Sequence, residues 1–150
     1  MKSAEVIADS IWKRVVVWDE FAKDVLGKQI ARAAYSMGAN IAESFGRYNF
    51  GEKLQFLYYS RGSLFETKYW LNRAQARGLM NPNEIREYVG DLTSLARQLN
   101  AFAAGLKTVR AGQLEKKSAV RESLAEYFTG ASEEFSAPLF SEDGFNWLNS

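Results

Sequence analysis

Hydrophobic residues recur with helical spacing over most of the first 110 positions of the chain. The clearest helix start is the stretch Asn81-Pro82-Asn83-Glu84. It combines an asparagine cap, a proline suited to the first helical position and a glutamate three residues after the cap. Apolar columns of period seven follow, which is typical of a seam between helices that pack at a shallow angle. They contain Ile85, Leu92, Leu99 and Leu106, then Tyr88, Leu95 and Phe102, then Val89, Ala96 and Ala103. We therefore predict a helix over about residues 82–110.

The same periodicity predicts three earlier helices, over about residues 3–17, 22–45 and 50–78. Gly46 can end the second, Asn49 and Glu52 can cap the third, and Gly78 can close it. The predicted core stripes contain Ala4, Ile7, Ile11, Trp12 and Val15 in the first helix, and Leu54, Leu57, Leu64 and Leu71 in the third. Because short connections join antiparallel neighbours, we expect an all-α, up-and-down, antiparallel four-helix bundle over residues 1–112 and a C-terminal extension over residues 113–150.

The helix expected over residues 22–45 is apolar or small around most of its circumference. On a helical wheel of roughly 100° per residue, its polar side chains fall within about 80° of one another. This polar stripe consists of Gln29, Arg32, Ser36, Asn40, Glu43 and Arg47. An ordinary bundle helix is apolar along one stripe only. We therefore expect this helix to be buried on two sides, by its own bundle and by another copy of the chain, so the sequence predicts a homo-oligomer.

The polar residues allow two interpretations. In the first, Gln29, Ser36, Asn40 and Glu43 form a polar network that fixes the register of the assembly, as a polar residue can in a coiled coil. In the second, exposed cations bind the phosphates of a nucleic acid. The candidate phosphate contacts are Arg32, Arg47, Lys53, Arg61 and Lys68. For Arg47, near a helix end, the two interpretations stay open.

Composition narrows the possible chemistry. The chain has no histidine and no cysteine, so it lacks the commonest general base, the usual zinc ligands and the residues of a disulfide. An enzyme would have to work with carboxylates alone, and no pattern marks such a site. We therefore expect a non-enzymatic protein with no catalytic residues, no cofactor and no metal. We see no secretory signal and no apolar run that could cross a membrane, so we expect a cytoplasmic protein that does not bind membranes.

Charge is unevenly distributed along the chain. Residues 1–112 contain 16 Lys and Arg against 11 Asp and Glu, a net charge of +5, whereas residues 113–150 contain 3 against 7, a net charge of −4. This difference in charge is either ordinary surface variation, or it indicates that the basic body binds a polyanion and that the acidic tail moderates this binding. The tail ends in apolar residues that either dock on the body or are offered to a partner protein. The partner-docking candidates are Phe140, Phe145, Trp147 and Leu148.

Two stretches carry a family resemblance: QIARAAYSMGANIAESFGR at residues 29–47 and FLYYSRGSLFETKYWL at residues 56–71. They resemble the bacterial four-helix-bundle family of 23S rRNA intervening-sequence proteins. That family typically shows Q-x-x-R-A-x-x-S-x-x-x-N-I-A-E-G-x-G-R followed by F-L-x-x-A/S-x-G-S-L-x-E. The matching positions are Gln29, Arg32, Ala33, Ser36, Asn40, Ile41, Ala42, Glu43, Gly46 and Arg47, then Phe56, Leu57, Gly62, Ser63, Leu64 and Glu66. Ser44 replaces a glycine of the pattern, and the likeness spans about residues 4–110.

The resemblance implies a four-helix bundle that assembles as a ring-shaped homopentamer without established catalytic activity. A related branch, the accessory variability proteins of diversity-generating retroelements, binds a reverse transcriptase and nucleic acid through a basic surface. Two hypotheses follow for this chain. The first is an oligomeric scaffold that binds RNA or DNA through its cations. The second is a protein-interaction scaffold that recruits a partner, such as a reverse transcriptase, through its ring faces or its tail.

Overall fold

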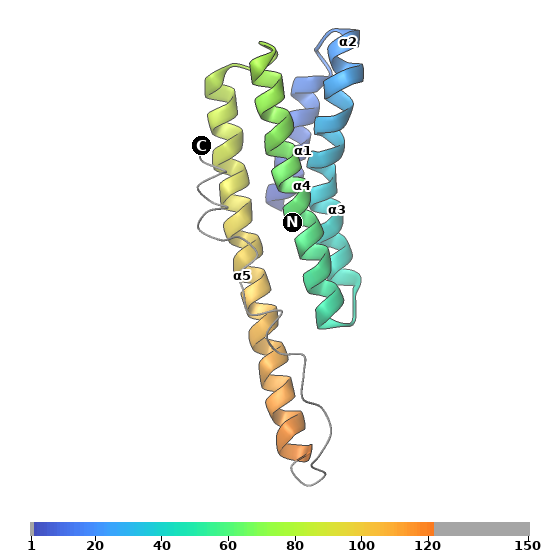
Figure 1. The fold of residues 1–150 in the computed structure, drawn as a ribbon, viewed down its shortest axis with the longest axis vertical. Helices are drawn as coiled ribbons and strands as arrows, with labels where there is room; N and C mark the ends of the chain where they lie inside the picture. The colour runs from blue at the N-terminus through green and yellow to red at the C-terminus, as the bar shows by residue number, and fades with distance from the viewer. Residues whose placement is uncertain (1, 122–150) are drawn as a thin grey trace.

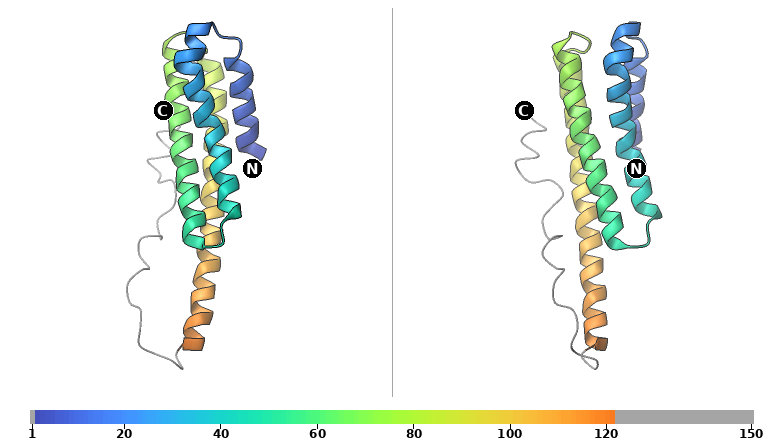
Figure 2. Two further views of the ribbon diagram at one scale, coloured as in Figure 1. Left: turned by 90° about the vertical axis from the view of Figure 1, so that its right-hand side faces the viewer. Right: turned by 45° about the vertical axis from the view of Figure 1, so that its right-hand side comes forward.

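The computed structural model describes residues 2–121, which fold into an all-helical bundle (Figure 1). The helices of this part of the chain are α1 (Lys2–Val15), α2 (Glu20–Ala22), the π-helical segment η1 (Lys23–Gly27), α3 (Lys28–Gly46), α4 (Phe50–Ala76) and α5 (Pro82–Arg121). The long helices α1, α3, α4 and α5 run alternately up and down, as predicted (Figures 1 and 2). Packing of α1 on α3, α3 on α4, α4 on α5 and α5 on α1 closes the bundle.

The predicted apolar columns form the core. The leucines of α4 at positions 54, 57, 64 and 71 are fully buried, and so are Leu92 and Leu95 of α5. Trp12, which we expected in the core stripe of the first helix, is instead 52% exposed. Ile7 and Ile11 fill the buried stripe of α1, and Trp12 lies about 100° further round the helix, at its edge. The prediction for Trp12 was therefore wrong.

The second predicted helix is not uniform. Asp19 caps its start, where its Oδ1 accepts a hydrogen bond from the Ala22 amide at 2.9 Å. The chain then widens into η1 before α3 begins. Gly27 in this segment approaches α1 closely, because a Cβ atom there would lie 2.7 Å from Cγ1 of Val15. The wide turn thus coincides with a tight contact between segments that no local sequence pattern reveals.

The fourth predicted helix is longer than expected. α5 continues past residue 110 to Arg121, and it extends well beyond the turn that joins α3 to α4 (Figure 1). This turn, residues 47–49, lies at the same end of the bundle as the projecting part of α5. At that end α1 is absent, since its N-terminus lies part-way along α3 (Figure 2). The bundle therefore has four helices at one end and three at the other.

The turn between α4 and α5 is fixed by hydrogen bonds on both sides. Gly78, with φ of +71°, ends α4 in a left-handed conformation, and the amides of Gly78 and Leu79 bond to carbonyls of the last turn. At the start of α5, the Asn81 side chain accepts hydrogen bonds from two amides, and the Asn81 amide donates to Oε2 of Glu84 at 2.8 Å. The capping motif predicted for this position is confirmed.

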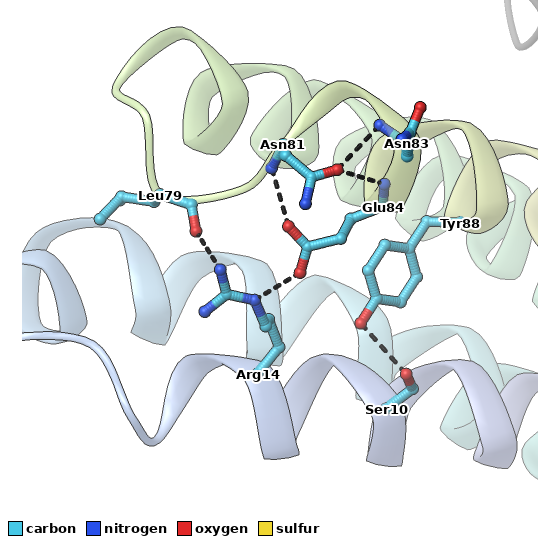
Figure 3. A network of polar contacts seen from close by, with 7 residues as sticks. All are labelled: Ser10, Arg14, Leu79, Asn81, Asn83, Glu84 and Tyr88. Carbon is cyan, nitrogen blue, oxygen red and sulfur yellow. Dashed lines mark hydrogen bonds and ion pairs between the residues drawn. The ribbon is translucent and has the colours of Figure 1, made fainter.

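Arg14 ties α1 to this turn. Its Nε donates to Oε1 of Glu84, and its Nη2 donates to the Leu79 carbonyl, both at 2.7 Å (Figure 3). One turn away, the hydroxyls of Ser10 and Tyr88 form a hydrogen bond of 3.1 Å between α1 and α5. The hydrogen bonds from Arg14 and from the Asn81 amide lower the pKa of Glu84 below its usual value.

The lowered pKa of Glu84 predicts a pH-dependent contribution to stability. A carboxylate with a lowered folded-state pKa stabilises the fold above its unfolded pKa of about 4.3, and this contribution is lost as the pH falls through the folded-state value. We expect Glu84→Gln to lower the free energy of unfolding at pH 7 by about 1 to 2 kcal/mol, and the difference from wild type to shrink below about pH 4. Urea unfolding at pH 7 and pH 3 measures both. Glu87→Gln, at an exposed position one turn on, is the control, and an equal loss in both variants would contradict the assignment.

Candidate nucleic-acid interface

The polar stripe of α3 makes its hydrogen bonds within its own helix. Nδ2 of Asn40 donates to the Ser36 carbonyl at 2.9 Å, and Arg47 forms an ion pair with Glu43 one turn earlier. Gln29, Ser36 and Asn40 are half-buried in the single chain. The structure thus places these residues on one side of α3, as the helical wheel predicted. Their role in assembly stays a prediction.

Arg47 is held against α4. Its guanidinium carbon lies 4.7 Å from the centre of the Phe56 ring, and its Nε is buried without a hydrogen-bond partner. The Phe56 ring meets the edge of Tyr59 at 5.5 Å, and the Tyr59 hydroxyl accepts a hydrogen bond from Gln55 at 2.7 Å. Two cation contacts, to Glu43 and to the ring, therefore fix the direction of Arg47. No sequence pattern indicates this cluster, because Arg47 lies at the end of α3 and Phe56 lies on α4.

The turn after α3 carries a second cation and an exposed aromatic ring. Asn49 caps α4 by accepting a hydrogen bond from the Gly51 amide at 2.9 Å. In the first turn of α4, Nζ of Lys53 lies 6.0 Å from the centre of the Phe50 ring. Between Arg47 and Asn49, Tyr48 is 102% exposed. Arg47 and Lys53 thus flank a short turn with an uncovered aromatic side chain at its tip.

The other candidate cations lie at increasing distances from the turn along α3 and α4. The guanidinium of Arg61 lies 5.6 Å from the Phe65 ring on α4. Lys68 is only 2% exposed, and burial lowers its pKa, so its ammonium group is not available on the surface of the single chain. Arg32 is exposed near the start of α3, where it lines an open groove of about 560 Å³ together with Trp12 and Tyr35. The five candidates therefore do not form one patch.

Positive charge concentrates around the turn. Residues 43–61 and 97–112 contain 6 Lys and Arg against 2 Asp and Glu, a net charge of +4 out of the +5 carried by residues 1–112. Phe45 near the end of α3 stacks on Phe102 of α5 at 5.1 Å, so these two segments lie together at the three-helix end of the bundle. The remaining residues of the body nearly balance their charges. The sequence indicates positive charge in residues 1–112, and the fold brings most of it to one end of the bundle.

One group of predicted residues lies outside the part of the chain that the structure describes. The docking candidates Phe140, Phe145, Trp147 and Leu148 fall outside residues 2–121. Among the described residues, no group of three or more acidic side chains is placed to hold a metal ion. Over the same range, no helix combines the length and the apolar character that crossing a bilayer requires.

Comparison with known proteins adds one family. The family model of the 23S rRNA-intervening sequence protein matches residues 1–101, which include α1, α3, α4 and the first half of α5. The chain belongs to this family. No curated protein matches it at a significant level. The 23S rRNA-intervening sequence match contains the turn with Arg47, Tyr48 and Lys53, and it ends before the projecting part of α5.

The contact between Arg47 and Phe56 can be measured by a double-mutant cycle on stability. Because the cation lies over the ring at a partly exposed site, we expect the variants Arg47→Ala and Phe56→Ala to be coupled by about 0.5 to 1 kcal/mol in the free energy of unfolding. A parallel cycle of Arg47→Ala with Tyr69→Ala, an aromatic further along α4, should give no coupling. Equal coupling energies in the two cycles would show that the contact does not stabilise the fold.

Proposed function

We propose that this protein is a non-enzymatic, homo-oligomeric scaffold that binds RNA through the three-helix end of its bundle. The observation that carries the proposal is the concentration of a net charge of +4 in the residues around the α3–α4 turn. Lysine and arginine contacts to phosphates supply most of the affinity of non-specific nucleic-acid binding. The family name associates these proteins with intervening sequences of 23S rRNA, so RNA is the polyanion that we test.

The positions of the cations support this proposal. Arg47, Lys53 and Arg61 each lie over an aromatic ring, which limits the conformations of three long side chains before a ligand arrives. Side chains that are already ordered lose less conformational entropy on binding. Arg32 is exposed near the start of α3, at the opposite end of this helix from Arg47, so it stands apart from these three cations. Lys68 is buried, so we leave it out of the proposed interface.

The α1–α3 face supports the homo-oligomer. Trp12 and Tyr35 lie with ring centres 6.5 Å apart on this face, about half exposed, and Ala39 and Ala42 beside them are exposed. An apolar surface with small residues allows another helix to approach closely, and exposed apolar patches commonly mark interfaces. In the pentamer that the family resemblance implies, the basic end of each subunit would lie in one ring. Each subunit would then add a net charge of +4 to one surface.

RNA binding is tested by its salt dependence. We expect the purified protein to bind a fluorescein-labelled RNA hairpin in anisotropy titrations, with an affinity that falls steeply as salt rises. Lys53→Ala should lower the slope of log affinity against log salt by about 1, because one phosphate contact is lost. Arg86→Ala removes the same charge at the far end of the bundle, near the start of α5, and should leave the slope unchanged. Binding that salt does not weaken would contradict the proposal.

An intact oligomer that binds no RNA would also contradict it, and would favour the protein-interaction scaffold. In that case the partner surface would be sought on the ring faces and in residues 131–150. Deletion of residues 131–150 would then remove a captured partner while the oligomer persists. Collapse of the oligomer on the same deletion would assign those residues to assembly.

Assembly through the α1–α3 face predicts a specific disruption. Light scattering after size exclusion should show an oligomer for the wild type. Ala39→Lys places a charge on the exposed face of α3 and should yield a monomer, because an unpaired charge in an apolar interface is strongly unfavourable. Ala76→Lys makes the same change at an exposed position at the end of α4 and should leave the oligomer intact. A wild-type monomer, or an oligomeric Ala39→Lys variant, would contradict this assignment.

A further inference from the structure

Tyr48 is the most exposed large hydrophobic side chain of residues 3–115. Its relative exposure is 102%, against 77% for Phe21, the next in rank. Burial of an aromatic ring is favourable, so a ring left wholly in water does not contribute this free energy to the fold. The preceding residue of the turn does not share this exposure, since Arg47 is half-buried against Phe56. The ring is therefore left uncovered at the tip of a connection that is otherwise tied down.

The backbone on both sides of Tyr48 is fixed. Arg47 has extended dihedral angles (φ −87°, ψ 140°), and its amide bonds back to the Ser44 carbonyl at 3.4 Å. Asn49 is also extended (φ −84°, ψ 132°), and its side chain accepts the Gly51 amide. The Arg47 side chain is held by Glu43 and by the Phe56 ring. Tyr48 thus projects from a short, anchored turn, which reduces the entropy lost when its ring contacts a ligand.

The cations beside the ring indicate its ligand. Arg47 and Lys53 flank Tyr48, and the charge of the surrounding segments is +4. Proteins that bind single-stranded nucleic acid combine such cations, which contact phosphates, with aromatic side chains on which bases stack. In a duplex the faces of the internal bases are covered by their neighbours, so only unpaired bases in loops, bulges and single strands can stack on a protein ring.

From this arrangement we propose that Tyr48 is a stacking platform for an unpaired RNA base, with Arg47 and Lys53 on the adjoining phosphates. This inference rests on the RNA-binding function proposed above and adds the class of RNA, namely RNA that offers unpaired bases. The protein then binds a single strand more tightly than the same strand in a duplex. Tyr48 contributes the preference for unpaired bases, whereas the cations contribute the salt-dependent affinity.

The test compares a short fluorescein-labelled RNA strand with the same strand annealed to its complement, in anisotropy titrations of the full chain. Tyr48→Ala should weaken binding of the single strand about tenfold and leave duplex binding nearly unchanged, since base–aromatic stacking is lost only in the first. Its salt slope should equal that of the wild type, whereas Lys53→Ala should lower the slope by about 0.7. Tyr48→Phe keeps the ring and should bind as the wild type does.

Tyr69→Ala is the matched control, because it removes a half-exposed tyrosine from α4 far along the helix from the turn. It should change neither affinity. Equal binding of the single strand by wild type and Tyr48→Ala would overturn the stacking role while leaving the proposed RNA-binding function standing. An equal loss for both RNAs would overturn the preference for unpaired bases. Failure of the wild type to bind either RNA would overturn the RNA-binding function itself.

Discussion

The close approach of α3 and α4 is the constraint on which the rest of the bundle depends. The buried hydroxyl of Ser60 on α4 donates to the Met37 carbonyl of α3 at 3.0 Å. Ser44 and Thr67 are also fully buried on these helices. Because the helices lie close together, a connection of three residues joins them, and the end of α3 reaches the Phe56 ring. Both the short turn and the cation contact beside it follow from this packing.

The pairing of α3 and α4 also determines where charge and aromatic surface meet. α1 begins part-way along α3, so within residues 2–121 the turn end of the hairpin is covered by α5 alone, through the stack of Phe45 on Phe102. The same end carries most of the positive charge of the body. A surface with a net positive charge attracts an anionic ligand, because the fields of its cations and carboxylates do not cancel. The proposed RNA-binding function thus draws on the asymmetry between the four-helix and the three-helix end.

The long helices and their caps were predictable because they depend on local patterns. The period-seven columns of α5 and the capping motif at Asn81 act within one helix, and the structure confirms both.

Other features depend on contacts between helices or on helix propensity alone. The π-helical segment contains Gly27, whose close approach to Val15 is a contact between helices. α5 continues past residue 110 without an apolar column, because its residues there, including glutamine, glutamate, lysine and arginine, favour helix. The burial of Lys68 and the contact of Arg47 with Phe56 depend on how the helices pack, so they could not be predicted from the sequence.

The length of α5 has a consequence for whatever follows it in the chain. A helix of 40 residues is about 60 Å long at a rise of about 1.5 Å per residue. Its last residue, Arg121, therefore lies roughly 28 Å along the axis beyond Phe102, the point where α5 meets the end of α3. This distance is several Debye lengths at physiological ionic strength. The projecting helix therefore holds its own end at Arg121 far enough from the α3–α4 turn that charges at the two places are screened from each other.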